Sequence, residues 1–210
     1  MKYLKRLEEI KAKLADLKTK DQEMKVFGAG DDAFFGMIGH HYELNPVLSE
    51  QEIEAEEKKL GIKLPEEYRE FLLEVGDGGA GPEWGLFKLD NTHPNDEFLA
   101  KYPDFCSMDC SYGDDYAIGI KGQVDKDPYY TEKVEPFGGY LKLADYGHGR
   151  TAYMVVGGDQ QVGKIWFLDE DGPDPYIVPA IQNIPGRDWQ VTFLDWFENW
   201  LDDSLAELKK

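Results

Sequence analysis

A glycine-rich run from Gly76 to Gly81 has the spacing of the dinucleotide-binding fingerprint, G-x-G-x-x-G. In that fingerprint the run follows a strand and opens a helix, so that the helix N-terminus meets the pyrophosphate. Here the run follows a helix-like pattern, and Pro82 leads into a stretch with strand character. Asp77 would also put a negative charge beside the phosphates. We therefore interpret the run as a helix stop and a turn that uses the positive φ angles open to glycine, with no bound cofactor.

Two cysteines, Cys106 and Cys110, lie near His93 and Asp104 in the sequence. Zinc sites usually combine two such closely spaced pairs of ligands, and here a second pair is missing. We therefore interpret both cysteines as ordinary small or buried thiols and expect no metal site.

His148 stands in a glycine-flanked turn near Asp145 and Arg150. An Asp–His pair can move protons because histidine titrates near neutrality. However, no nucleophile stands in a recognisable elbow, so a turn histidine that makes backbone hydrogen bonds is the favoured interpretation. The acidic run 169–172 lacks the spacing of a calcium loop. We expect no catalytic residue and predict that the protein is not an enzyme.

Acidic residues beside aromatic ones are the best candidates for a binding site. Glu83-Trp84 follows the glycine turn, and a second such group opens a predicted strand. Trp and Tyr are favoured interface anchors, and carboxylates suit a basic partner. The alternative is that the aromatic side chains are core residues and the acids are solvated. The candidate partner-binding residues are Asp77, Glu83, Trp84, Asp114, Asp115, Tyr116, Asp145, Tyr146 and His148.

The chain carries a net charge of −19. Such a charge repels nucleic acid and anionic membrane surfaces, because binding to either is driven by Lys and Arg. It attracts a basic protein and accelerates the encounter, although acidity also serves solubility alone. Two cysteines suggest a reducing compartment, and neither a membrane span nor a signal peptide is recognisable. We expect a cytoplasmic protein whose partner is another protein; the oligomeric state stays open.

The pattern of apolar residues predicts helices first and strands later. Residues 1–20 carry an apolar stripe and more Lys and Arg than Asp and Glu. Ser49 with Glu52 forms a capping box for a second helix that ends at Gly61. A third helix follows Pro65 and ends at Gly76.

After Gly76 the pattern alternates with a period of two. The predicted strands are 84–89, 116–121, 140–144, 151–156 and 164–168, and a closing helix begins near Thr192. This order predicts an α+β fold, with a predominantly antiparallel or mixed sheet flanked by N-terminal and C-terminal helices. We expect residues 1–39 to form a leading helix and a connection, and residues 40–210 a single domain with an irregular segment around 91–139. The leading helix could pack on this domain, pair with a partner helix or stay semi-detached.

Several segments follow one another in a characteristic order. They are 48–53 (LSEQEI), 57–72 (EKKLGIKLPEEYREFL), 75–82 (VGDGGAGP), 143–149 (LADYGHG), 155–157 (VVG), 163–166 (GKIW) and 193–201 (FLDWFENWL). Together they resemble the SUKH superfamily, which includes the fungal Smi/Knr cell-wall regulators and many bacterial proteins. The resemblance covers about residues 40–203.

The resemblance implies a mixed sheet flanked by helices, with the glycine-rich turn beside a groove used for protein contacts. Bacterial members are often immunity proteins that bind and block a toxin domain, whereas fungal members act as hubs in cell-wall signalling. The length favours an immunity protein of the bacterial type, with a regulatory scaffold as the alternative. The superfamily has no general catalytic residues to carry over. It implies nothing about the leading helix or segment 91–139, where partner preference could reside.

Overall fold

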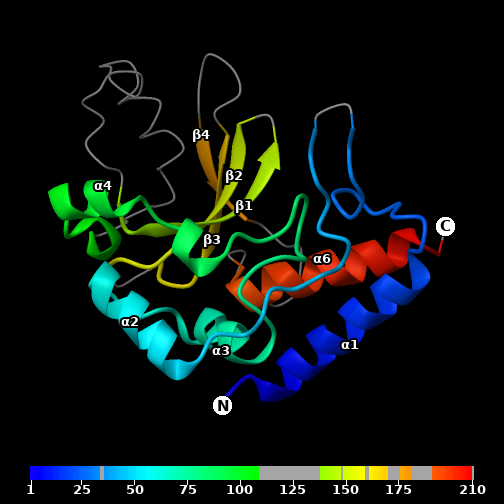
Figure 1. Ribbon diagram of the computed structural model, residues 1–210, viewed down its shortest axis with the longest axis horizontal. Helices are drawn as coiled ribbons and strands as arrows, with labels where there is room; N and C mark the ends of the chain where they lie inside the picture. Colours follow the sequence, from blue (N-terminus) through cyan, green and yellow to red (C-terminus); the bar gives the residue numbers. More distant parts are fainter. Residues whose placement is uncertain are drawn as a thin grey trace.

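Helices at both ends of the chain enclose a run of strands in the computed structural model (Figure 1). The structure describes residues 1–33, 36–108, 138–147, 149–158, 161–169, 176–180 and 191–209. Its helices are α1 (Leu4–Lys20), α2 (Glu50–Leu60), α3 (Glu66–Glu74), α4 (Asp96–Lys101) and α6 (Phe193–Glu207), with 3-10 turns η1 (Leu89–Asn91) and η2 (Phe105–Ser107).

Four strands form one sheet in their chain order: β1 (Tyr140–Gly147), β2 (Arg150–Val155), β3 (Ile165–Asp169) and β4 (Tyr176–Pro179). Every neighbouring pair is antiparallel, which confirms the predicted α+β fold with flanking helices. The pairing of β1 with β2 is irregular on both sides of Ala144 and Asp145. Such irregularities bend a strand and redirect its side chains.

Local sequence signals account for the helix ends. The Ser49 hydroxyl accepts a hydrogen bond from the Glu52 N–H, while the Glu52 carboxylate accepts one from the Ser49 N–H. Gly61 ends α2 with a φ of 68°, the left-handed conformation in which glycine is favoured. Pro65 immediately precedes α3. The predicted caps of α2 are confirmed, whereas α3 ends at Glu74 with Val75, not the predicted Gly76, as its C-cap.

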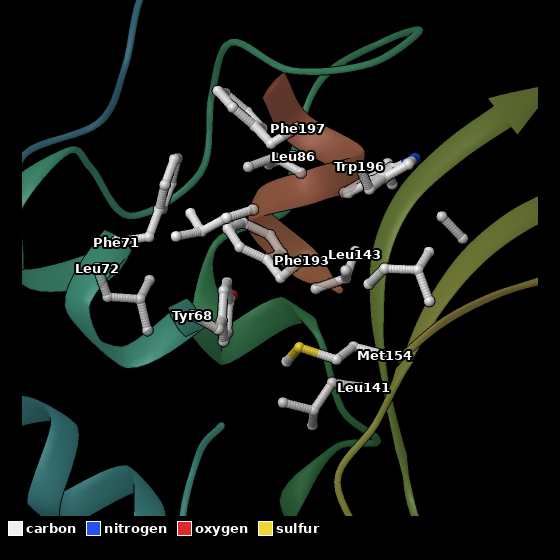
Figure 2. Close-up of a cluster of buried hydrophobic side chains, with 14 of the residues drawn as sticks. Tyr68, Phe71, Leu72, Leu86, Leu141, Leu143, Met154, Phe193, Trp196 and Phe197 are labelled. Carbon is white, nitrogen blue, oxygen red and sulfur yellow. The ribbon is translucent and has the colours of Figure 1, made fainter. Parts of the chain in front are cut away.

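The core lies between the helices and one face of the sheet (Figure 2). Phe71 of α3 meets Phe193 and Phe197 of α6 edge-on, with ring centroids 5.0 and 4.9 Å apart. Leu141, Leu143 and Met154 cover this aromatic group from the sheet side. Edge-on aromatic packing adds to the burial of apolar surface, so this group fixes how the helices sit on the sheet.

The leading helix α1 packs against α6 and α3. Its apolar stripe, Leu7, Ile10, Leu14 and Leu17, is buried in the same core as the sheet. Its basic side chains face acids of the body, and the ion pairs are Lys2–Glu66, Arg6–Asp195, Arg6–Glu198, Lys11–Glu74, Lys13–Asp202 and Lys18–Glu43. Of the three arrangements that the sequence left open, the structure shows packing on the protein's own body.

Arg6 is the centre of the contact between these helices. Its guanidinium donates to Asp195 at 2.8 Å and to both carboxylate oxygens of Glu198 at 2.7 and 3.0 Å. Glu67 of α3 lies 3.7 Å away. Burial alone would raise the pKa of Asp195, but the hydrogen bond from Arg6 lowers it below its usual value. One side chain therefore joins α1, α3 and α6.

Some elements differ from the sequence prediction. Residues 84–89 do not form a regular strand: Leu86 makes isolated bridges to Gly79 and Ala144, and Leu89 begins η1. The expectation was wrong because residues 83 and 85 have positive φ angles, which an extended strand cannot contain. β4 and α4 were not predicted, and the predicted strand 116–121 lies outside the described residues. No helix in the described part of the chain has the length and apolarity needed to cross a membrane.

We predict that Arg6→Ala lowers the free energy of unfolding by about 3 kcal/mol, because three largely buried carboxylates lose their counterion. Chemical denaturation at neutral pH measures the change. Lys5→Ala is the matched control, since Lys5 is 90% exposed and its ion pair within the described residues is with Glu9 on the same helix. It should change stability by less than about 0.5 kcal/mol. Equal costs for the two variants would contradict the central role of Arg6.

Candidate functional site

The glycine-rich run is a tight loop built onto the edge of the sheet. Gly79 and Leu86 exchange backbone hydrogen bonds of 2.9 and 2.7 Å, and the Phe87 N–H donates to the Leu143 carbonyl at 2.8 Å. A Cβ on Gly79 would lie 2.4 Å from the Glu43 carbonyl oxygen, where no side chain fits. The glycines therefore allow close approach of three backbone segments, as expected for a turn.

Leu86 fixes this loop to the core. Its side chain is buried and lies beside α6 near Phe197 and Trp196 (Figure 2). The preceding residues, Glu83 and Trp84, remain half-exposed at the tip of the loop. The loop therefore presents these two side chains from a rigid base.

Two neighbouring segments hold the tip. Gly28 lies so close to the Glu83 carbonyl that a Cβ at position 28 would be 1.6 Å from the oxygen. The Trp84 ring meets Phe27 edge-on, with centroids 5.1 Å apart. On the other side, a Cβ on Gly147 at the end of β1 would be 3.8 Å from Trp84 Nε1. The tip thus joins the segment before residue 40 to the β1–β2 turn.

Tyr146 extends the site toward the closing helix. Its hydroxyl accepts a hydrogen bond from Trp196 Nε1 at 3.0 Å, and its ring meets Phe167 edge-on. The Arg150 guanidinium lies over both rings, 5.8 and 5.6 Å from their centroids. Such cation–π contacts hold a guanidinium over an aromatic surface.

The charges at this site influence one another. Burial raises the pKa of Glu83, and the positive charge of Arg150 partly offsets that rise. Burial also raises the pKa of Tyr146, and the negative charge of Glu83 contributes to this rise.

The structure therefore brings Glu83, Trp84 and Tyr146 together. The sequence prediction missed Phe27 and Phe167, which are distant from the other site residues along the chain, and it gave Arg150 no role in the site although this residue lies four positions after Tyr146.

Two other candidate residues have local structural roles. Asp145 accepts a hydrogen bond from the Gly147 N–H at 2.7 Å, which shapes the end of β1. The Asp77 carboxylate accepts one from the Leu89 N–H at 2.8 Å at the base of the loop, and burial raises its pKa. Both stabilise the loops that carry the site. The candidates Asp114, Asp115, Tyr116 and His148 lie outside the described residues.

Of the residues considered for metal binding, Cys106 and His93 have buried side chains, whereas Asp104 is exposed. Cys106 is buried, and burial raises the pKa of its thiol to about 11. The His93 side chain is 2% exposed, with Nε2 2.8 Å from a carboxylate oxygen of Glu56. Within the described ranges, no three His, Cys, Asp or Glu side chains are grouped closely enough to hold a metal ion. Cys110 lies outside those ranges.

His40 links the segment that contains Gly28 to the residues that follow the hairpin. Its backbone N–H donates to the Gly28 carbonyl at 3.1 Å, and its Nδ1 accepts from the Tyr42 N–H at 3.0 Å. The ring meets Tyr42 and Trp200 edge-on. Burial lowers the pKa of His40 to about 4, with a smaller contribution from His41. The ring is therefore neutral near pH 7.

Comparison with known proteins gives one match. A family model described as SMI1 / KNR4 family (SUKH-1) matches residues 47–181, which run from just before α2 to just past β4. No curated protein and no solved structure matches the chain. The match contains the glycine-rich loop and the sheet, while α1, Phe27 and α6 lie outside it.

We predict that Gly28→Ala lowers the free energy of unfolding by about 3 kcal/mol, because the φ of 76° and the Glu83 carbonyl both oppose a Cβ. Gly36→Ala is the control: its φ is 69°, but nothing lies within 4 Å of the added carbon. It should cost about 1 kcal/mol. Thermal unfolding measures both, and hydrogen exchange at residues 83–85 should accelerate in Gly28→Ala alone. Identical behaviour of the two variants would refute the close approach.

A second prediction concerns pH. The unfolded chain takes up a proton on His40 as the pH falls through about 6.5, whereas the folded protein resists until about 4. The contribution of neutral His40 is therefore complete above pH 6.5 and declines below it. His40→Asn keeps an acceptor for the Tyr42 N–H but does not titrate. Relative to this variant, the wild type should lose about 2 kcal/mol of stability between pH 6.5 and 4.5, measured by urea denaturation. Parallel curves would show that His40 is not responsible.

Proposed function

The chain belongs to the SMI1 / KNR4 family (SUKH-1), and we propose on this basis that it is a non-catalytic immunity protein of the bacterial type, which binds and neutralises a basic toxin domain. The observation that carries the proposal is the tip of the glycine-rich loop, where Glu83 and Trp84 are presented beside Tyr146. Trp and Tyr are frequent anchors at the centre of protein interfaces, and a carboxylate beside them complements a basic partner.

The distribution of charge supports a basic partner. Residues 1–20 contain seven Lys or Arg and three Asp or Glu, which leaves 16 Lys or Arg and 39 Asp or Glu in the remainder. Several cations of α1 pair with acids of α3 and α6 within the molecule. The glycine-rich loop has no cation of its own, since residues 76–87 contain Asp77 and Glu83 but no Lys or Arg; the cation at the site is Arg150, next to the β1–β2 turn. Such a surface attracts a cationic domain from a distance.

The described titratable groups favour binding over catalysis. The Cys106 thiol is held protonated by burial, and Asp77 and Asp145 are engaged with backbone N–H groups. A thiol in this state is a poor nucleophile.

We propose the cytoplasm as the location, because a buried free Cys106 is compatible with a reducing compartment.

The second candidate function is a regulatory scaffold of the Smi/Knr type. The family match favours it as well, because the matched model is named for those proteins. The same loop tip would then engage a cellular partner. Recovery of several housekeeping proteins from native lysate, with no toxin-protective effect, would support this candidate.

The test is co-expression with the toxic domains encoded beside the gene, with cell survival and complex formation as readouts. Wild-type protein should restore growth and form a one-to-one complex. We predict that Trp84→Ala weakens this complex about 30-fold, as removal of a central Trp anchor usually does. Glu83→Gln should lower the association rate and reduce its dependence on salt.

Glu54→Gln is the matched control, because Glu54 is exposed on α2, a separate element. It removes the same charge and should leave affinity within about twofold. Circular dichroism and thermal unfolding of each variant confirm folding. If wild-type protein neither protects cells nor binds any neighbouring toxic domain, the immunity function is wrong.

A further inference from the structure

A short hairpin precedes the family-matched region and lies against the proposed site. We call residues 27–33 and 36–39 the leading hairpin. Asp32 and Met37 exchange backbone hydrogen bonds of 2.9 and 3.0 Å across it. Its base is fixed by hydrogen bonds from the His40 and His41 N–H groups to the carbonyls of Gly28 and Ala29. In Figure 1 it projects beside the β1–β2 turn, on the side of the molecule away from α2 and α3.

The leading hairpin exposes large apolar side chains from both of its legs. Phe27 is 58% exposed and Ile38 is 81% exposed, although the protein buries most side chains of these types. Phe27 is in edge-on contact with Trp84 of the proposed site. Isolated exposed apolar residues are ordinary, but here the aromatic pair continues directly into a half-exposed carboxylate–tryptophan tip. Phe27 is therefore in contact with the proposed site, and Ile38 lies on the opposite leg of the same hairpin.

The charges around this surface indicate what it binds. Residues 27–43 contain Asp31, Asp32 and Glu43 and no Lys or Arg; Lys18 of α1 pairs with Glu43, and Arg150 lies near Glu83. Asp31 is largely exposed and accepts hydrogen bonds from the Gly39 N–H and from His41 Nε2. An apolar centre within an acidic rim complements an apolar side chain flanked by cations. An acidic or phosphorylated partner would be repelled.

Building on the proposed protein-binding function, we propose that Phe27 and Ile38, together with Trp84, form the apolar centre of the partner surface. This centre takes an aliphatic or aromatic side chain that is flanked by Lys or Arg on the partner. Because residues 27–39 precede the family match at residue 47, the leading hairpin supplies a contact specific to this chain and its relatives with the same extension. A cation brought beside Glu83 would also stabilise the charged form of that carboxyl.

The experiment selects short random peptides displayed on phage against the full-length protein. The expected result is enrichment of peptides with an apolar residue between Lys or Arg residues. Ile38→Ser and Ile38→Lys should weaken binding of such a peptide at least about tenfold, with the Lys variant the weaker because it repels the basic flanks. Ile38 is mostly exposed, so these variants fold normally. Phe27→Ser should act in the same direction.

Val47→Ser is the matched control, since Val47 is 48% exposed and lies outside the leading hairpin. It should leave peptide affinity unchanged. No enrichment, enrichment without basic flanks, or binding that is insensitive to Ile38 would each overturn the inference.

The outcome separates this inference from the function on which it rests. Full protection from the toxin by an Ile38→Lys and Phe27→Ser double variant would overturn the inference and leave the immunity function standing. Peptide binding that depends on Ile38, without any protection by wild-type protein, would overturn the immunity function and leave the surface standing.

Discussion

The guanidinium of Arg6 meets three carboxylates where α1, α3 and α6 converge. A buried charge without a partner destabilises the folded state. Loss of the Arg6 guanidinium therefore leaves the carboxylates around it without their counterion. The apolar stripe of α1 supplies the attraction, and the ion pairs fix its orientation. Hydrogen bonds also fix the chain at the C-terminal end of α1. There Asp21 accepts them from the Tyr42 hydroxyl and from the Lys25 and Val26 N–H groups. The segment that leads to the leading hairpin therefore begins from a defined position.

The sequence predicted those features that depend on near neighbours along the chain. The capping box of Ser49 and Glu52, the stop at Gly61 and the alternation in β2 are all local patterns, and the structure confirms them. The close approach of Gly28 to Glu83 could not be predicted, because it joins residues far apart in sequence and involves only backbone atoms. The position of Arg150 over Phe167 could not be predicted either, because the two side chains come from different strands. The prediction of a strand at residues 84–89 was wrong, because Gly85 has a positive φ angle that interrupts an extended strand.

The family and the charge explain different parts of the proposed function. Membership of the family accounts for the loop, the sheet and the expectation of a protein partner. The net charge of −19 favours a partner with a positively charged surface and accelerates the encounter with it. Shape and apolar contact determine which basic protein is retained, because charge alone discriminates weakly among cationic surfaces. The half-exposed aromatic residues at the loop tip are suited to that second task.

The contact between Gly28 and Glu83 has an evolutionary consequence. Two loops that touch through their main chains must keep their backbone paths together, so a length change in one requires a matching change in the other. The side chains next to that contact, Phe27 and Trp84, are partly or largely exposed and meet each other edge-on. Substitutions at these two positions can therefore accumulate while the frame beneath them stays constant. Under the proposed immunity function, this arrangement gives a partner surface that diversifies without refolding.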